Sequence, residues 1–177
     1  MSGGAYPWLR LNDTVLLRQC REERYRASGP GGQRRNKVET AVRLRHLDTG
    51  LVGQAEESRY LQENRKRALR RLRLKLALEL RAAFNLTDPQ LPKEFFSYIG
   101  ARGRLAVSPA NPDYPLVVAV ILDAIAAAEG SYGRAARALG ITTSQLIKFL
   151  TSDPAIQRAA GLLKDHPSRV QGQGSVL

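Results

Sequence analysis

The clearest pattern along the chain is a helical one that runs from about Ser58 to Phe84. Leucines recur within it three or four residues apart, a spacing that places them on one face of an α-helix. Basic residues occupy much of the remaining surface. The pattern predicts one long helix with an apolar stripe at Leu69, Leu72, Leu76, Leu80 and Phe84 and a basic surface at Arg67, Arg70, Arg71, Arg73 and Lys75.

The segment ahead of this helix shows the pattern of short strands. Apolar and charged residues mix from Thr40 to Leu47, and a second run begins at Leu51 after Asp-Thr-Gly, which is typical of two strands joined by a turn. Residues 21–27 are also expected to be extended, with Tyr25 as the strongest β-former. We therefore expect a small α/β domain over residues 1–84.

The second half of the chain predicts a different domain. Residues 85–115 form a proline-rich connector, in which fixed φ angles and missing N–H donors disfavour regular structure. Beyond it we expect a small all-helical domain at residues 116–166 and a disordered tail at 167–177. The fold class is thus α+β, and its last part contains helices at about 116–129, 132–139, 143–150 and 154–164.

Charge separates the two halves further. The 177 residues carry a formal net charge of +12, of which residues 1–84 contribute +10 and residues 85–177 only +2. Clustered Lys and Arg gain free energy by displacing counterions from phosphates, so a polyanionic partner is expected for the first half. The single cysteine, Cys20, forms no disulfide framework and is expected to pack as a small apolar side chain.

Membrane, metal and cofactor functions find little support. The apolar run from Leu116 to Ala128 is interrupted by Asp123 and is too short to span a bilayer. His46 and His166 stand alone, without neighbouring ligands for a metal ion. We therefore expect a cytoplasmic protein that needs no cofactor or metal and contacts no membrane.

The strongest candidate for chemistry is a glycine-rich loop that ends in Gly31, Gly32 and Gln33. Glycines adopt φ values closed to other residues, so backbone N–H groups of such a loop can approach a substrate closely. They could then stabilise the oxyanion that forms when water attacks an ester. The Gln33 side chain could exclude nucleophiles bulkier than water. The alternative for an isolated Gly-Gly-Gln is a tight turn between strands.

The residues around the loop carry a more specific signal. Arg26 to Gln33, then Asn36 to Leu44, then Thr49-Gly50 resemble, in order and spacing, the catalytic domain of bacterial and organellar peptide-chain release factors. Downstream, the resemblance extends through Asn64 to about Ala83. It implies an α/β sandwich whose loop enters the ribosomal peptidyl-transferase centre. There the Gln backbone amide would coordinate the transition state of peptidyl-tRNA hydrolysis.

Two features set the chain apart from that family. Arg34 and Arg35 replace the His-Val that commonly follows the glutamine, and Tyr60-Leu61 replaces a usual Ser-Gln.

Only about 20 residues precede the strand before the loop, whereas codon-reading members carry a further domain there. The chain is therefore more similar to short, codon-independent ribosome-rescue members, although its end lacks their basic tail.

The expected partners are the ribosomal large subunit, with its 23S-type rRNA, and peptidyl-tRNA, bound by a monomer. Arginine-rich surfaces contact phosphates without reading sequence. The alternative for the long helix is an ordinary solvated face. The candidate RNA contacts are Arg34, Arg35, Asn36, Lys37, Arg65, Lys66, Arg70, Arg71 and Arg73.

Residues 130–146 resemble the helix-turn-helix found at the end of bacterial enhancer-binding regulators. Small alanines allow two helices to cross closely, and Gly140 supplies the turn. The exposed reading positions would be Thr143, Ser144, Gln145 and Lys148. A helical packing unit without nucleic-acid contact is the alternative.

These observations lead to one main functional hypothesis, codon-independent hydrolysis of peptidyl-tRNA on ribosomes. A variant of it is action on free large subunits. The competing hypothesis is a non-catalytic nucleic-acid-binding protein in which the helix-turn-helix is functional and the loop is vestigial. The concentration of charge in the first half favours the first hypothesis.

Overall fold

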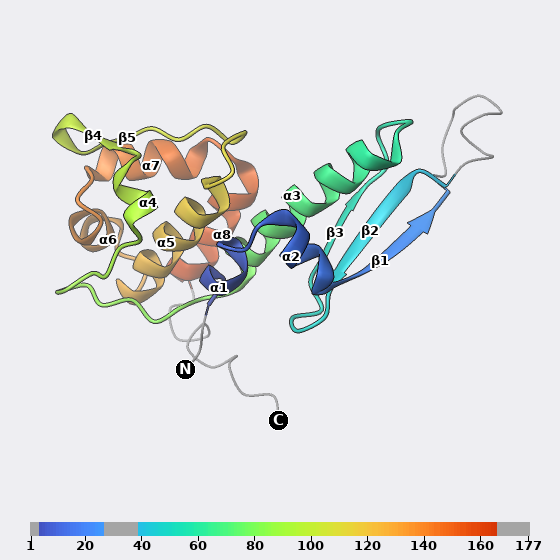
Figure 1. Ribbon diagram of the computed structural model, residues 1–177. Coiled ribbons are helices and arrows are strands. Elements are labelled where there is room, and N and C mark those ends of the chain that lie inside the picture. The colour runs from blue at the N-terminus through green and yellow to red at the C-terminus, as the bar shows by residue number, and fades with distance from the viewer. Residues whose placement is uncertain (1–3, 27–38, 166–177) are drawn as a thin grey trace. The chain divides into compact units, whose positions relative to one another are not determined.

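The computed structural model describes residues 4–26 and 39–165, and its helices and strands confirm the α+β class (Figure 1). Contacts divide the chain into two compact units. The first, here called the sheet unit, is Arg10–Leu76. The second, the helical unit, combines Met1–Leu9 with Ala77–Leu177.

The sheet unit is built on a three-stranded antiparallel sheet of order β1-β2-β3, formed by Cys20–Tyr25, Ala41–His46 and Val52–Ala55. Its register pairs Tyr25 with Ala41 and Val42 with Ala55. The helix α2 (Asp13–Arg18) precedes the sheet, capped by the Asn12 side chain. Helix α3 (Leu61–Glu79) follows it. The strands expected around residues 21–27, 40–47 and 51 are thus present, with ends shifted by one or two residues.

Helix α3 packs directly against the sheet at Gly53. A Cβ atom at this position would lie 2.3 Å from the Ala68 carbonyl oxygen and 2.6 Å from the Leu72 nitrogen, distances that no side chain tolerates. Val42 and Leu44 of β2 and Ala68, Leu69 and Leu72 of α3 are buried. The predicted apolar stripe therefore forms the core of this unit over its first part.

The end of the long helix differs from the prediction. The pattern placed it at Phe84, but α3 ends at Glu79. The backbone N–H of Ala82, which a continuing helix would direct to a carbonyl four residues earlier, donates instead to Asp123 Oδ1 at 3.1 Å. The buried Asp123 carboxylate thus accepts the Ala82 N–H in place of a helix carbonyl. Leu80 and Phe84 lie beyond the end of α3.

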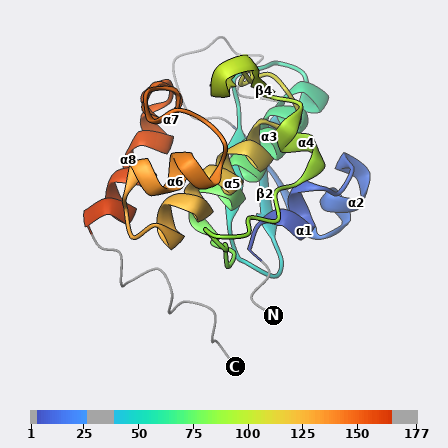
Figure 2. The ribbon, with the colours of Figure 1, turned by 90° about the vertical axis from the view of Figure 1, so that its left-hand side faces the viewer.

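The helical unit surrounds α5 (Tyr114–Ala127), a helix buried over almost its whole length. Contacts join α5 to α1 (Tyr6–Leu9), to α6 (Tyr132–Ala138) and to α8 (Pro154–Asp165), while α7 (Thr143–Thr151) contacts α6 and α8 (Figure 2). The four helices expected after residue 115 are present within two residues of their predicted ends. The short α1 was not predicted.

The turn between α6 and α7 has a well-defined hydrogen-bond pattern. Gly140 adopts φ +68° and donates to the Arg137 carbonyl oxygen at 3.2 Å, while Ile141 donates to that of Ala136 at 3.1 Å. This pair of bonds is a Schellman motif, which ends a helix with a left-handed glycine. The Thr142 side chain then accepts from the Gln145 N–H and caps α7. The sequence thus specifies both the end of α6 and the start of α7.

The proline-rich connector contains more regular structure than expected. It includes α4 (Lys93–Phe96), the short strands β4 (Ile99–Gly100) and β5 (Arg104–Leu105), and the 3-10 turn η1 (Ala101–Gly103). No proline occurs between Pro92 and Pro109, so backbone donors remain for these elements. Contacts assign the whole connector to the helical unit. As folding boundaries, the limits expected at residues 84 and 115 stay predictions.

Candidate nucleic-acid interface

The loop residues Gly31, Gly32, Gln33, Arg34, Arg35, Asn36 and Lys37 lie outside the described residues, as do His166 and the tail from 167. The described part of the hairpin ends on each side of the loop. There Tyr25 of β1 pairs with Ala41 of β2, and the Arg26 guanidinium lies 3.6 Å from the Glu39 carboxylate. The candidate loop therefore connects two adjacent strands whose ends are held in register.

Asn64 fixes one end of this loop to α3. Its buried side chain donates through Nδ2 to the carbonyl oxygens of Thr40 and Ser58, both at 2.7 Å. Its Oδ1 accepts from the Ser58 N–H at 2.9 Å. The Asn64 amide thus joins Thr40, which precedes β2, to Ser58, which precedes α3. Asn64 therefore fixes the start of β2 relative to the start of α3.

Replacing Asn64 by alanine should destabilise the chain by about 1–3 kcal/mol, because it leaves three half-buried backbone groups of Thr40 and Ser58 without this partner. Denaturant unfolding would measure the effect. Gln62→Ala, which removes an exposed amide from the same helix, is the matched control. Equal stabilities of the two variants would contradict the anchoring role.

Tyr25 forms an aromatic contact at the base of the loop. Its hydroxyl donates to Glu56 Oε2 at 3.2 Å, and the Arg43 guanidinium carbon lies 5.4 Å from the ring centroid. Partial burial, followed by the Glu56 carboxylate, raises the pKa of the Tyr25 hydroxyl above its ordinary value. The hydroxyl therefore remains a neutral donor at physiological pH, oriented by its contacts with β2 and the end of β3.

The five basic candidates on α3 divide into two groups. Lys66 and Arg70 are one turn apart and exposed, and neither forms an ion pair with any residue of the described ranges. Arg67 is exposed beside them and lies 4.0 Å from Glu63. These side chains share one face of α3, since residues four apart lie above one another on a helix. This face has cationic groups that remain available for phosphates.

The other three basic candidates are engaged within the sheet unit. Arg73 is 11% exposed and donates to the Leu11 carbonyl oxygen at 2.6 Å and to Asp13 at 3.0 Å. Arg71 bonds to the Gln54 carbonyl oxygen at 2.7 Å and to Glu57, while Arg65 lies 2.6 Å from Glu22. The sequence pattern predicted the same role, contact with RNA, for all five residues. Their contacts instead favour a structural role for Arg73 and a partly structural one for Arg65 and Arg71.

The helix-turn-helix candidates lie at the start of α7. Thr143, Ser144 and Lys148 are exposed, and Gln145 is half-buried. On the other face of α7, Leu146, Phe149 and Leu150 are buried. Three of the four positions expected to be exposed are thus exposed, and Lys148 is the single charge on this helix.

A buried ion pair in the helical unit was missed from the sequence. Asp123 is fully buried on α5, accepts from the Tyr6 hydroxyl at 2.6 Å, and lies 3.4 Å from the Arg81 guanidinium. Burial raises the pKa of Asp123 to about 6, although Arg81 opposes this shift. The sequence signal for this ion pair was a single acidic residue, Asp123, within an apolar helical pattern. Nothing in that pattern indicated that Tyr6 and Arg81 are its partners.

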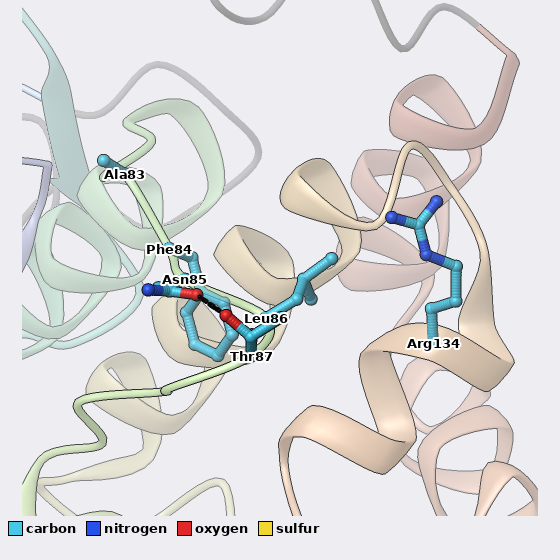
Figure 3. A pocket seen from close by; sticks show the side chains of 6 residues that line it. All are labelled: Ala83, Phe84, Asn85, Leu86, Thr87 and Arg134. Carbon is cyan, nitrogen blue, oxygen red and sulfur yellow. Dashed lines mark hydrogen bonds between the residues drawn. The ribbon is translucent and has the colours of Figure 1, made fainter.

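Other features of the described residues that bear on a site are a pocket, a thiol and an imidazole. A shallow pocket is lined by Ala83, Phe84, Asn85, Leu86, Thr87 and Arg134, and Figure 3 shows one charged side chain, Arg134, across from neutral ones. Burial raises the pKa of Cys20 to about 11 and lowers that of His46.

Within the described ranges, His, Cys, Asp and Glu form no group of three or more suited to a metal ion. The helices described there are each too short or too polar to cross a membrane.

Comparison with known proteins places similarity in the first half of the chain. Residues 13–93 match the family described as the RF-1 domain. A 77-residue segment is 43% identical to peptide chain release factor 2 of Buchnera aphidicola subsp. Baizongia pistaciae, covering 42% of this chain and 21% of the relative. A 59-residue segment is 49% identical to peptide chain release factor 1 of Acidiphilium cryptum, covering 33% and 17%.

The chain therefore spans about a fifth of the length of these curated relatives. The matched family segment ends at residue 93, where α4 begins, and so before β4 and the helices α5 to α8. No solved structure matches the chain.

Proposed function

We propose that the chain hydrolyses the ester of peptidyl-tRNA on ribosomes without reading a stop codon, because residues 13–93 match the RF-1 domain family and segments of the chain are similar to peptide chain release factors. The observation that carries the proposal is the match itself, which spans the glycine-rich loop and both strands beside it. The proposed partners are the large ribosomal subunit and peptidyl-tRNA.

The proposed chemistry is attack of water on the ester carbonyl carbon. The carbonyl oxygen becomes an oxyanion, the bond to the tRNA ribose oxygen breaks, and that oxygen takes up a proton. We assign the backbone N–H of Gln33 as a donor to the oxyanion and its side chain to the selection of water. Gly31 and Gly32 allow the backbone to approach the ester closely.

Two features of the sheet unit support this assignment. Asn64 and the Arg26–Glu39 pair hold the ends of the loop, which limits the geometries in which it meets a substrate. Lys66 and Arg70, which form no ion pair with the residues that the structure describes, offer positive charge to rRNA phosphates. The further proposed contacts are Arg34, Arg35, Asn36 and Lys37. Recognition of the stalled complex is assigned to the helical unit, most of which lies beyond the family match.

Purified full-length protein, added to ribosomes that carry peptidyl-tRNA, tests the proposal. The ribosomes would have a sense codon, a stop codon or no mRNA in the A site, and free large subunits would form a fourth sample. We expect release that does not require the stop codon. Strict dependence on a stop codon would contradict codon independence. No release in any sample would favour the alternative, a nucleic-acid-binding protein with a vestigial loop.

Neutralising Lys66 and Arg70 to glutamine should weaken ribosome binding and flatten its salt dependence. Each lost phosphate contact removes roughly one unit from the slope of log affinity against log salt. Arg71→Gln with Arg73→Gln is the matched control, because it removes the same charge from side chains engaged within the sheet unit. That control should lower stability more and the slope less. The same slope change in both double variants would show that only net charge matters.

A further inference from the structure

A short hairpin of the connector, Ile99–Leu105, packs against the turn between α6 and α7; we call it the arginine hairpin. Thr142, the residue that caps α7, directs its backbone N–H to the Gly103 carbonyl oxygen at 3.4 Å. A Cβ atom at Gly103 would lie 3.1 Å from Ile141 Cα and 3.2 Å from the Thr142 nitrogen. The two backbones therefore touch, and β5 lies beside α7 (Figure 1).

Two arginines flank this contact. Arg102 and Arg104 are exposed, and neither forms an ion pair within the described part of the chain. Arg102 also adopts φ 60° and ψ 29°, the left-handed region that favours glycine. A glycine would adopt this backbone conformation without strain. Stability of the fold alone would therefore favour glycine over arginine at this position. Residues held in sparsely populated backbone conformations cluster at functional sites.

The described contacts of nearby and other carboxylates in the helical unit are made with groups other than these two arginines. The carboxylate of Asp113, near the base of the hairpin, accepts from the Tyr98 hydroxyl at 2.7 Å. Glu129 lies 3.6 Å from Arg134 of α6. Beside the hairpin, the start of α7 exposes the hydroxyl side chains of Thr143 and Ser144, followed one turn later by Lys148.

We propose that the arginine hairpin and the first turns of α7 together bind the phosphate backbone of a double-stranded nucleic acid. Guanidinium and hydroxyl groups are the usual donors to phosphate oxygens. Proteins that bind single strands add aromatic rings on which bases stack. In the hairpin and α7 as described, the one aromatic residue is Phe149, which is buried. This binding is separate from the loop chemistry and does not depend on it.

The test is binding of the full chain to a short blunt duplex, in RNA and DNA versions, measured by fluorescence anisotropy at several salt concentrations. Arg102→Gln with Arg104→Gln should lower the salt slope by about 1.8 on DNA, since each phosphate contact contributes about 0.9. Between 50 and 200 mM salt, affinity should then fall about twelvefold less than for the wild type. Arg158→Gln with Lys164→Gln removes the same charge from α8 and should change the slope little.

A further variant separates binding from folding. Arg102→Gly should weaken duplex binding while it raises the thermal unfolding temperature, because it relieves the left-handed backbone. Unchanged binding by this variant, equal slope changes in the two double variants, or tighter binding to single strands would each overturn the proposal. Comparison of the RNA and DNA duplexes identifies the preferred source of the phosphates. Peptide release by the same proteins is assayed separately, so failure of the proposed hydrolysis leaves this result standing.

Discussion

Gly32→Ala should reduce the rate of peptide release on the order of a hundredfold or more, and Gly31→Ala should do the same. An alanine at either position restricts φ and adds a Cβ where the backbone must approach the ester. Loss of one preorganised oxyanion donor has an effect of this size. The measurement is single-turnover release from stalled ribosomes at saturating protein, which separates the chemical step from binding.

Gln33→Ala is the matched control for this prediction. It keeps the backbone N–H and removes only the side chain, so release should slow modestly, and small amines should compete better with water as nucleophiles. Ribosome affinity should be similar for all three variants. Equal and small effects of the three substitutions would contradict the assignment of the oxyanion donor to the backbone.

Asp123→Ala should destabilise the helical unit by about 3–5 kcal/mol, the cost of removing one partner from a buried ion pair. The variant leaves the Tyr6 hydroxyl, the Ala82 N–H and the Arg81 guanidinium without their acceptor. Denaturant unfolding of the full chain measures the loss. Asp153→Ala, at a half-exposed carboxylate ahead of α8, is the control and should cost less.

Asp123→Asn should have a much smaller effect, because an amide keeps the volume and one acceptor. Burial raises the pKa of Asp123 from 3.8 to about 6, so the folded chain holds a proton that the unfolded chain releases. Wild-type stability relative to the asparagine variant should therefore fall as pH rises from about 4 to about 6. A difference that instead grows with pH over this window would show that the carboxylate is stabilised in its ionised form.

Much of the fold follows from local patterns in the sequence. The alternating residues of β2, the Asp-Thr-Gly turn after it and the leucine spacing of α3 each depend on neighbours within a few residues. The same is true of Gly140, whose left-handed conformation ends α6. Features that depend on distant partners were not predicted: α3 ends early because Asp123 captures the Ala82 N–H, 41 residues away in the chain.

The candidate site shows the same division. Composition identifies a basic helix, but it does not separate Arg70, which is exposed and unpaired within the described chain, from Arg73, which bonds to Leu11 and Asp13. That distinction depends on segments about 60 residues apart. Asn64 likewise appeared in the sequence as part of a family pattern. Its contact with Thr40 explains, in physical terms, why an amide is suited to that position.

The most direct test of the central claim is peptide release in water enriched in oxygen-18. Purified wild-type protein would be added to ribosomes that carry peptidyl-tRNA, and the released peptide would be analysed by mass spectrometry over time. We expect release well above the rate of ribosomes alone, with one labelled oxygen in the new terminal carboxyl group, and loss of this acceleration in Gly32→Ala. Release no faster than from ribosomes alone, or equally fast with Gly32→Ala, would contradict hydrolysis by the loop.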